Sequence, residues 1–564
     1  MPQHCTECTQ YCPQSELLSF DVRERLGGTH PFVASETAEI SQLVEAAEAD
    51  VRGYNSKINW LRQRAATLEV EKRAFEERLL VAKSLLSPIR RLPVEVLLHI
   101  FAFCSDDNEI TCTNTRHVGG NLEEIEATLR IVMYPLRLMK VCRSWKLIVA
   151  SNPSLWSILS VNILITPTDV TMGEAMEHAV ASVLRASRNH PLEIALWQIP
   201  GFGGSLHASI MLCVAECRRW SWASLTFPDL QALCDGQLQS LQGNVPLLEH
   251  VELYSEARVE ETHILAIAPR LRSVKVEYSP TSKIALPWSQ LHYVECARGL
   301  FAEAVQCLQW AKRLRYFSVE GFCSWDTADD SSLLLTPIVS NVDEVHLQLE
   351  RYHKQENEQI LSMMRCPQIR SLTLGCIDES EEDGPEEEEP EENSDPVNEI
   401  VSGPCLCAFL SSCSKTLTML TLGSNLLSEE DFINALGLIP QLEVLNIRNV
   451  QPRPFFTAAT CSRLLGYGQG ISRTLIPKLQ YLTVHLAHGN GVDFSQFSTL
   501  VLSRCIPTHT HNAIACSTLK NVSFSIGDIS FSLEEQAKWK PCLVEGLSVT
   551  LMDRDGFVNI HDSE

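Results

Sequence analysis

The residue types best suited to metal chemistry stand at the start of the chain. His4, Cys5, Cys8 and Cys12 lie close together, and a Cys-x-x-Cys pair can present two thiolates to zinc while His4 or Cys12 adds a third ligand. No second pair stands nearby to complete a four-ligand site. The segment 1–34 is therefore predicted to be a disordered tail with incidental cysteines, and no metal or cofactor is expected. A zinc site shared with a partner chain is the alternative.

Other motifs for catalysis or nucleotide binding are incomplete. The glycine-rich runs Gly201–Gly204 and Gly466–Gly470 lack the strand and helix context of a nucleotide fingerprint. The chain has no Walker lysine and no nucleophile-elbow serine. His509 and His511 form an isolated pair in a loop-like segment, which is typical of surface histidines. The sequence therefore predicts no enzyme activity.

Length and charge bound the remaining possibilities. The chain has 564 residues, too many for one compact core, so two or more domains or an extended array are expected. Its net charge of −24 argues against general binding to nucleic acids or anionic membranes, which requires basic patches. The stretch 378–399 holds 13 acidic residues and no Lys or Arg, and is predicted to be a disordered insert.

The 21 cysteines do not indicate disulfides. The first residues lack the basic and then apolar segments of a signal peptide. No apolar run approaches the roughly 18–20 residues of a membrane span. Cysteines such as Cys142 and Cys296 stand inside apolar patterns, where they are expected to behave as small buried hydrophobic residues. Because free cysteines are expected, the protein is predicted to act in a reducing compartment, in the cytoplasm and/or the nucleus.

A long coiled-coil helix is predicted over 35–87. Seam residues recur there in alternating steps of four and three, the a/d pattern of a heptad repeat. They are Ile40, Val44, Ala47, Val51, Tyr54, Ile58, Leu61, Ala65, Leu68, Lys72, Phe75, Leu79, Ala82 and Leu86. Such a helix would be roughly 75–80 Å long. Because no second heptad helix follows in the sequence, homodimerisation is the leading hypothesis. A different partner protein and folding back onto the chain's own repeats are the alternatives.

Two apolar segments of defined spacing follow this helix. The first reads Leu92-Pro93-x-Glu95-x-Leu97-x-x-Ile100-Phe101, and the second reads Leu138-x-x-Val141-Cys142-x-x-Trp145, followed by Pro153-x-Leu155-Trp156. Pro93 suits the first turn of a helix, where its missing N–H has no partner to lose. Glu95 in the same turn is favoured by the helix dipole.

These segments resemble the F-box, a three-helix module that docks on a Skp-type adaptor of cullin-RING ubiquitin ligases, as in the large F-box sets of fungi. The resemblance covers Ile89–Trp156 and implies an all-α module over 88–157. A largely polar insert at about 105–133 departs from the family, which usually has a short link there. The residues implied to form the docking surface and core of the module are Leu92, Pro93, Glu95, Leu97, Ile100, Phe101, Leu138, Val141, Cys142, Trp145, Leu155 and Trp156.

Beyond Trp156 the chain is repetitive. A strand-like core resembling Leu-x-x-Leu-x-Leu recurs eleven times, beginning at Trp222, Leu248, Leu271, Leu291, Leu314, Val342, Ile369, Leu417, Leu442, Leu479 and Leu519. Seven of the ten steps between cores fall within the period of about 20–29 residues of leucine-rich repeats. An earlier, irregular strand is predicted at Pro191–Trp197. The fold class is therefore α/β: a leucine-rich-repeat solenoid over 158–564, preceded by the coiled-coil helix and the all-α module.

Alternation along each predicted strand sends the leucine-type residues inward and the residues between them outward. The outward set includes Glu252, Tyr254, Lys275, Glu277, Tyr293, Glu295, Tyr316, Glu320, Glu344 and Tyr481. Five glutamates against one lysine make this face mildly acidic. Binding of a basic segment of a target protein is one hypothesis, and ordinary solvated side chains are an equally good explanation.

The resemblance implies the function of a substrate-recognition adaptor of an SCF-type cullin-RING ubiquitin ligase. The module at 88–157 would bind the Skp-type adaptor, Leu155 and Trp156 would close it against the first repeats, and the repeats would hold the target protein. Such a protein needs no catalytic residue, because it acts by raising the effective concentration of its target. The alternative is a non-catalytic coiled-coil and leucine-rich-repeat scaffold that recruits no ligase, which the insert keeps open.

Overall fold

The structure is a computed structural model of the chain. It describes residues 33–104, 108–116, 125–164, 170–199, 206–227, 230–234, 236–255, 261–278, 281–299, 301–322, 337–350, 354–377, 400–423, 427–449, 458–465, 475–486, 494–505, 517–526, 539, 547–554 and 556–558. The chain divides into two compact units, residues 1–97 and 98–564.

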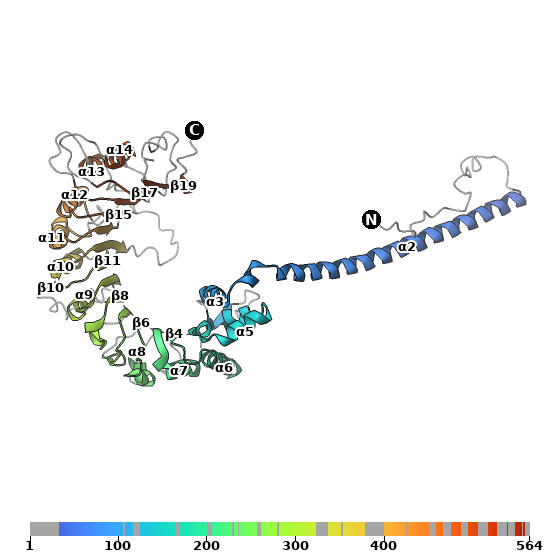
Figure 1. Ribbon diagram of the computed structural model, residues 1–564, viewed down its shortest axis with the longest axis horizontal. Coiled ribbons are helices and arrows are strands. Elements are labelled where there is room, and N and C mark those ends of the chain that lie inside the picture. The colour runs from blue at the N-terminus through green and yellow to red at the C-terminus, as the bar shows by residue number, and fades with distance from the viewer. Residues whose placement is uncertain are drawn as a thin grey trace. The chain divides into compact units, whose positions relative to one another are not determined.

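The first unit consists mainly of one long helix, α2 (Ala34–Leu85), at the position predicted for the coiled coil (Figure 1). Its first turn is closed by the backbone N–H of Val33, which donates to Glu36 Oε2 at 3.2 Å. The helix ends just before Pro88, which cannot continue it and opens the short 3-10 helix η2 (Pro88–Arg91). The next helix, α3 (Val94–Phe103), begins directly after Pro93.

The second unit is built on a sheet of 17 strands within the described residues. All neighbouring strands from β3 to β18 pair in parallel. The strands are β1 (Glu109–Arg116), β2 (Ile125–Val132), β3 (Ile158–Ile163), β4 (Leu192–Gln198), β5 (Trp220–Thr226), β6 (His250–Tyr254), β7 (Ser273–Glu277), β8 (Tyr293–Gly299), β9 (Tyr316–Phe322), β11 (Glu344–Glu350), β13 (Ser371–Ile377), β14 (Met419–Leu422), β15 (Val444–Asn449), β16 (Tyr481–Leu486), β17 (Asn521–Ile526), β18 (Ser548–Asp553) and β19 (Gly556–Val558). A separate pair joins β10 (Ile338–Val339) to β12 (Met364–Arg365).

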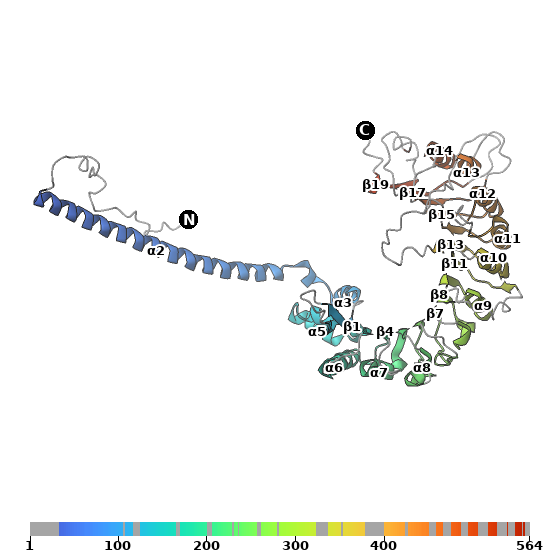
Figure 2. The same cartoon turned by 180° about the vertical axis from the view of Figure 1, so that it is seen from behind.

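Helices connect these strands and lie on the outer side of the curved sheet, while the strands line its inner side (Figures 1 and 2). The α-helices are α4 (Tyr134–Met139), α5 (Arg143–Ser151), α6 (Val170–Ala186), α7 (Ala208–Ala215), α8 (Leu230–Cys234), α9 (Phe301–Trp310), α10 (Lys354–Met363), α11 (Gly403–Cys413), α12 (Glu429–Leu438), α13 (Ala458–Leu464) and α14 (Phe494–Cys505). The 3-10 helices are η3 (Pro153–Trp156), η4 (Cys217–Arg219), η5 (Gln237–Leu241), η6 (Thr281–Lys283) and η7 (Trp288–Gln290). This is the leucine-rich-repeat solenoid that the sequence predicts.

The eleven predicted strand cores are confirmed one by one. They correspond to β5 through β9, β11 and β13 through β17, and the irregular strand predicted at Pro191–Trp197 is β4. Within each strand the alternation is also as predicted: Val251 and Leu253 of β6 are buried, while Glu252 between them is only half-buried. Val251 pairs with Val274 of β7, so buried residues of successive strands form one continuous core.

The insert at about 105–133, to which the sequence assigned no structure, forms a β-hairpin. Strands β1 and β2 pair antiparallel, with Glu109 opposite Val132. The other edge of β1 pairs in parallel with β3, the first strand of the solenoid, with Ile110 opposite Val161. Ile110 and Cys112 are fully buried. The insert therefore extends the sheet of the repeats instead of looping away from them.

Candidate docking surfaces

The second unit begins with a small helical module formed by the end of α3 from Leu98, α4, α5 and η3. Phe101 is fully buried, and its ring centroid lies 4.7 Å from that of Trp145 on α5. The indole Nε1–H of Trp156 donates a hydrogen bond to the carbonyl oxygen of Val149 at 3.2 Å. Cys142 caps α5, because its Sγ accepts a hydrogen bond from the backbone N–H of Trp145 at 3.5 Å. These contacts fix the helices around an aromatic core.

Asn108 connects this module to the sheet. Its side chain is 1 % exposed and stands just before β1. Nδ2 donates to the carbonyl of Leu155 at 3.4 Å, and Oδ1 accepts from the backbone N–H of Tyr134, at the start of α4, at 3.1 Å. The backbone carbonyl of Asn108 accepts from Ser160 N of β3 at 2.9 Å. One residue of the insert therefore positions α4, η3 and the first repeat strand together.

Apolar side chains remain exposed on the same helices. Phe103 at the end of α3 is 75 % exposed, and Val141 at the start of α5 is 58 % exposed. The other exposed members are Ile100, Leu136 and Leu147. Because the core of the module is already filled by Phe101, Trp145 and Trp156, these side chains form an apolar surface that a partner protein could cover.

The inner face of the solenoid, formed by the outward side chains of β5 through β11, contains a tight polar cluster. Lys275 Nζ lies 2.5 Å from Glu295 Oε1, and the hydroxyl of Tyr293 donates to Glu295 Oε2 at 2.6 Å. The hydrogen bond to Glu295 raises the pKa of Lys275. Burial, followed by the same carboxylate, raises the pKa of Tyr293 above its ordinary value. Both donors therefore keep their protons at neutral pH.

A second cluster lies on β5 through β7. His250 Nε2 is 3.3 Å from Glu252 Oε1, and His250 Nδ1 is 2.7 Å from Ser273 Oγ. The imidazole stacks parallel to the indole of Trp222, with ring centroids 5.7 Å apart. The hydrogen bond from His250 is the main cause that lowers the pKa of Glu252, so this carboxylate is ionised and partnered at neutral pH.

An aromatic row continues across β8, β9 and β11. Tyr293 stacks parallel to Tyr316 at 4.2 Å between ring centroids, and Tyr316 lies 5.0 Å from His346. Burial lowers the pKa of His346, which favours its neutral form. Glu320 and Glu344 are exposed beside this row, and no ion pair within the described residues involves either of them. The inner face thus presents aromatic rings with two carboxylates at their side.

Comparison with known proteins identifies the helical module. Residues 89–161 match the model of the F-box-like family. No curated protein sequence matches the chain. Among solved structures, the leucine-rich repeat-containing protein LegL7 from Legionella pneumophila is similar with a TM-score of 0.28 and 12% identity, over 71% of this chain and 92% of that one. An internalin (InlF) from Listeria monocytogenes has a TM-score of 0.26 and 11% identity, over 68% and 83%. The solenoid assignment itself rests on the strand pairing described above. The chain thus combines an F-box-like segment with a leucine-rich-repeat solenoid.

The twelve residues predicted for the F-box-like segment differ in burial. Leu97, Phe101, Leu155 and Trp156 are buried; Leu92, Leu138, Cys142 and Trp145 are half-buried; Pro93, Glu95, Ile100 and Val141 are exposed. Sequence reasoning did not single out Phe103, Leu136 and Leu147, which are exposed apolar residues of the same helices. Phe103 follows Ile100 by three positions, so helical spacing could have indicated it. Docking by any of these residues stays a prediction.

The ten outward residues predicted for target binding all point away from the solenoid core, since none of them is buried. Three of the five glutamates have basic or imidazole neighbours: Glu252 has His250, Glu295 has Lys275, and Glu277 Oε1 lies 3.7 Å from Arg298 Nε. Lys275 was already counted from sequence, and His250 lies on the same strand as Glu252. Arg298 is the cation that the sequence count left out, so the face is somewhat less acidic than that count suggests. Binding of a target here stays a prediction.

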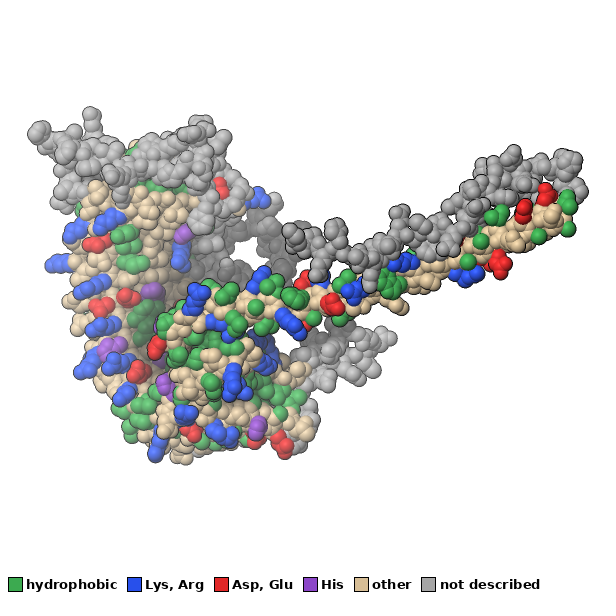
Figure 3. All heavy atoms as spheres, turned by 45° about the vertical axis from the view of Figure 1, so that its right-hand side comes forward, with side chains coloured by type: hydrophobic (Ala, Val, Ile, Leu, Met, Phe, Trp, Pro, Cys, Tyr) green, Lys and Arg blue, Asp and Glu red, His purple; other side chains and the backbone are tan. Residues whose placement is uncertain are grey.

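The helix α2 presents a separate apolar surface. Nine apolar side chains of its heptad seam are 41–75% exposed: Val44, Val51, Tyr54, Ile58, Leu61, Leu68, Phe75, Leu79 and Leu86. Figure 3 shows hydrophobic side chains along the surface of this helix. In a heptad pattern such a stripe is the surface through which helices pair, and pairing of α2 stays a prediction.

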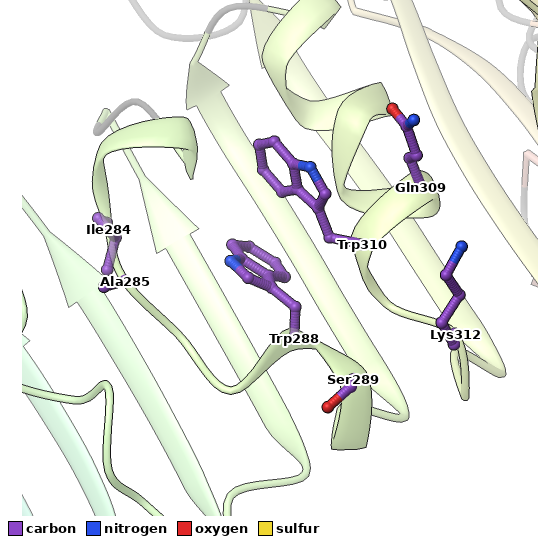
Figure 4. A pocket seen from close by; sticks show the side chains of 7 residues that line it. All are labelled: Ile284, Ala285, Trp288, Ser289, Gln309, Trp310 and Lys312. Atoms are coloured by element: carbon purple, nitrogen blue, oxygen red, sulfur yellow. The ribbon is translucent and has the colours of Figure 1, made fainter.

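A shallow pocket of about 570 Å³ lies where the chain enters β8 and leaves α9 (Figure 4). Trp288 and Trp310 stand side by side in it, with ring centroids 5.3 Å apart. Gln309 and Lys312 also line it, and the lining contains no carboxylate, histidine or cysteine. This composition suits an apolar side chain and provides no groups for acid, base or nucleophilic chemistry.

Most of the described cysteines are buried, as predicted, but Cys104, Cys142, Cys405 and Cys407 are half-buried. The prediction was wrong for Cys142, whose Sγ caps α5. Burial raises the pKa of Cys213 and of Cys366 to about 12, and that of Cys413 to about 11, so these thiols stay protonated at neutral pH. Cys296 is likewise buried. Within the described ranges no group of three or more His, Cys, Asp or Glu side chains could hold a metal ion. No helix there is long and apolar enough to cross a membrane.

Several predictions of the sequence lie outside the described residues. These are the cysteines and histidine of the N-terminal tail, the glycine-rich runs Gly201–Gly204 and Gly466–Gly470, the acidic insert 378–399, and His509 and His511.

Proposed function

We propose that this protein is the substrate-recognition adaptor of an SCF-type cullin-RING ubiquitin ligase, acting in the cytoplasm and/or the nucleus. The observation that carries the proposal is the F-box-like match on a helical module with exposed apolar side chains. That module shares a sheet with the solenoid through β1 and β3. In this proposal the module binds a Skp-type adaptor, the solenoid binds the target protein, and ubiquitin transfer is performed by other subunits.

The contribution of this chain is positional. A target held on the solenoid experiences a high local concentration of the ubiquitin-loaded enzyme that the adaptor brings. Because Asn108 bonds α4, η3 and β3 at once, the adaptor-binding helices and the first repeats keep a fixed orientation. A fixed orientation limits which lysines of the target come within reach.

The adaptor arm of the proposal is tested by binding of the purified chain to a purified Skp-type adaptor. Phe103→Ala removes a side chain that is 75 % exposed, so it should leave the fold intact and weaken adaptor binding at least about tenfold. Leu92→Ala/Pro93→Ala should do the same. Ile267→Ala is the matched control, because Ile267 is 61 % exposed on the repeats and should not affect the adaptor. A folded wild-type chain that does not bind the adaptor would leave the ligase-free scaffold as the better account.

We further propose that the target docks on the inner face over β8, β9 and β11. The rings of Tyr293 and Tyr316, beside the carboxylates of Glu320 and Glu344, suit a segment that carries an arginine or lysine. Quantitative proximity labelling with the wild type, Tyr316→Ala and Glu344→Gln should identify proteins whose labelling both variants lose. Thr483→Ala, on the outward side of β16, is the control. Partners retained by every variant would contradict this location.

We also propose that α2 associates with a second copy of the chain, because its exposed seam is apolar except for Lys72 and continues through more than six heptads. Sedimentation of the full chain over a concentration series tests this directly.

A further inference from the structure

The orientation of the two α2 helices in such a dimer can be decided from the charges that flank the seam. In heptad terms Val44, Val51 and Ile58 stand at a positions, and Tyr54, Leu61 and Leu68 at d positions. The charged residues that flank the seam, at positions e and g, then choose between parallel and antiparallel pairing.

A parallel, in-register pair brings each g residue against the e residue five positions later in the partner. Arg64 would then lie against the partner's Glu69, which is favourable. The other three charged pairs would be of like sign: Lys57 with the partner's Arg62, Glu71 with the partner's Glu76, and Arg78 with the partner's Lys83. Two-fold symmetry doubles every pair, so a parallel dimer would combine six repulsive contacts with two attractive ones.

An antiparallel pair centred on Gln63 reverses this balance. Side chains lean toward the N-terminus of their own helix, so in this arrangement g converges on g and e on e. The resulting pairs are Lys57 with the partner's Glu71, Glu48 with the partner's Lys83, and Arg62 with the partner's Glu69. All three are of opposite sign and occur twice. Asp50 is buried in the single chain and is left out of this count. Arg64 meets the partner's Arg64 at the two-fold axis. The like-charged e neighbours, Glu48 with Glu76 and Arg62 with Arg62, lean away from each other, because each side chain points toward its own N-terminus.

The seam also fits this register. Residues equally distant from Gln63 face each other, so the layers pair Ile58 with the partner's Leu68, Val51 with the partner's Phe75, and Leu79 with the partner's Ala47. Lys72, the single charge of the seam, meets the partner's Tyr54, whose ring offers a cation–π contact and whose hydroxyl can accept a hydrogen bond. In a parallel pair Lys72 would instead face the partner's Lys72.

We infer that α2 forms an antiparallel homodimer centred on Gln63. This inference rests on the proposed self-association and is independent of adaptor binding. In such a dimer the C-terminal ends of the two α2 helices are separated by about 70 Å along the rod, since about 46 residues at 1.5 Å each lie between them. The two F-box-like segments, which follow those ends in the sequence, are therefore joined to opposite ends of the rod.

Arg62→Glu in the full chain tests the geometry, because the two orientations predict opposite effects. In the antiparallel dimer the substitution creates two Glu–Glu contacts with Glu69, and the dissociation constant should rise about tenfold. In a parallel dimer it would turn the contact with Lys57 attractive and tighten the dimer. Arg62 has no acidic residue three or four positions away, so its helix should be unaffected. Arg52→Glu, at a position away from the seam, is the charge-matched control; it replaces an exposed ion pair with Glu48 by two like charges four positions apart, a small cost to its own helix.

Mixing variants provides a rescue that helix damage cannot imitate. The Arg62→Glu chain and the Glu69→Arg chain should each self-associate weakly, and their mixture should dimerise like the wild type. Benzoylphenylalanine in place of Phe75 should crosslink to the partner near Val51. A tighter Arg62→Glu dimer, or crosslinks between the two Phe75 sites, would overturn the antiparallel arrangement and leave self-association intact. A wild-type chain that stays monomeric at tens of micromolar would overturn self-association itself, whatever its binding to the Skp-type adaptor.

Discussion

Asn108 lies in the segment 105–133, which departs from the F-box pattern as an insert, yet its replacement should loosen the F-box-like helices. Asn108→Ala leaves the carbonyl of Leu155 and the N–H of Tyr134 without their partners in a buried place. A buried polar group without a partner costs about 1–3 kcal/mol. Because the bond to Leu155 is long, at 3.4 Å, we expect a total near the lower half of that range for two groups, about 2–4 kcal/mol.

Native-state hydrogen exchange is the suitable assay, because a chain of this length does not unfold in one step. If the free energy of local opening falls by about 2–4 kcal/mol, protected amides exchange roughly 30- to 1,000-fold faster. The change should appear in peptides that cover α4, α5 and η3, while peptides from β13 through β17 keep their wild-type protection. Adaptor binding should weaken in parallel.

Asn162→Ala is the control for this experiment. Asn162 is a half-buried asparagine of β3, on the outward side of the sheet. Its Nδ2 donates to Glu109 Oε1 at 2.8 Å and to Thr111 Oγ1 at 3.3 Å, and its Oδ1 accepts from Ser160 Oγ at 3.2 Å. Solvent can replace these side-chain bonds, so their loss should change exchange only a few-fold. The reasoning would be refuted if Asn108→Ala left the exchange of α4 and η3 within about twofold of the wild type, or if both asparagine variants behaved alike.

Two further predictions concern protonation. The pKa of Glu252 is lowered in the folded chain, chiefly by the hydrogen bond from His250. Its ionised form therefore stabilises the fold above the unfolded pKa of about 4.3, and this stabilisation is lost as the pH falls through the lower, folded pKa. Because Glu252 is partly exposed, we expect only some tenths to about 1 kcal/mol in the urea stability of β5 through β7, and Glu252→Gln should abolish that part of the pH dependence. The thiols of Cys213, Cys366 and Cys413 should resist iodoacetamide at pH 8 in the folded chain and react in urea; labelling of the native protein would contradict the burial that raises their pKa values.

The repeats could be predicted from sequence because each strand repeats one physical requirement. The spacing of Leu248, Val251 and Leu253 recurs in every unit, since each unit must bury the same face against its neighbours. Strand β18 was not predicted, because Ser548–Asp553 has only one fully buried side chain, Leu551, and so shows no leucine pattern. The hairpin β1–β2 was not predicted either. In β1 only Ile110 and Cys112 are apolar, among threonines and charged residues. In β2 the alternation of Ile125, Ala127, Leu129 and Ile131 is a strand signal that the sequence reasoning did not use.

The surfaces were harder to predict than the core. In the F-box-like segment, Phe101 and Phe103 lie two positions apart in one apolar run. The sequence does not show that Phe101 is buried and Phe103 exposed. On the inner face, the count of glutamates could be made from sequence, yet the partners of Glu277 and Glu295 depend on strand register. Lys275 and Glu295 are neighbours only because β7 and β8 align them.

The pairing of β1 with β3 also constrains how the chain is made. During synthesis the helices α3, α4 and α5 all emerge before β3 is complete at Ile163, and β3 is the strand that pairs in parallel with β1. Until then β1 has only the hairpin contact with β2, which is marginal by itself. The F-box-like segment can therefore complete its contacts only once the first repeat strand has left the ribosome. Under the proposed function, a nascent chain that stalls earlier would not present a finished docking surface. This folding order would then keep a ligase from being recruited by a chain that has no repeats with which to hold a target.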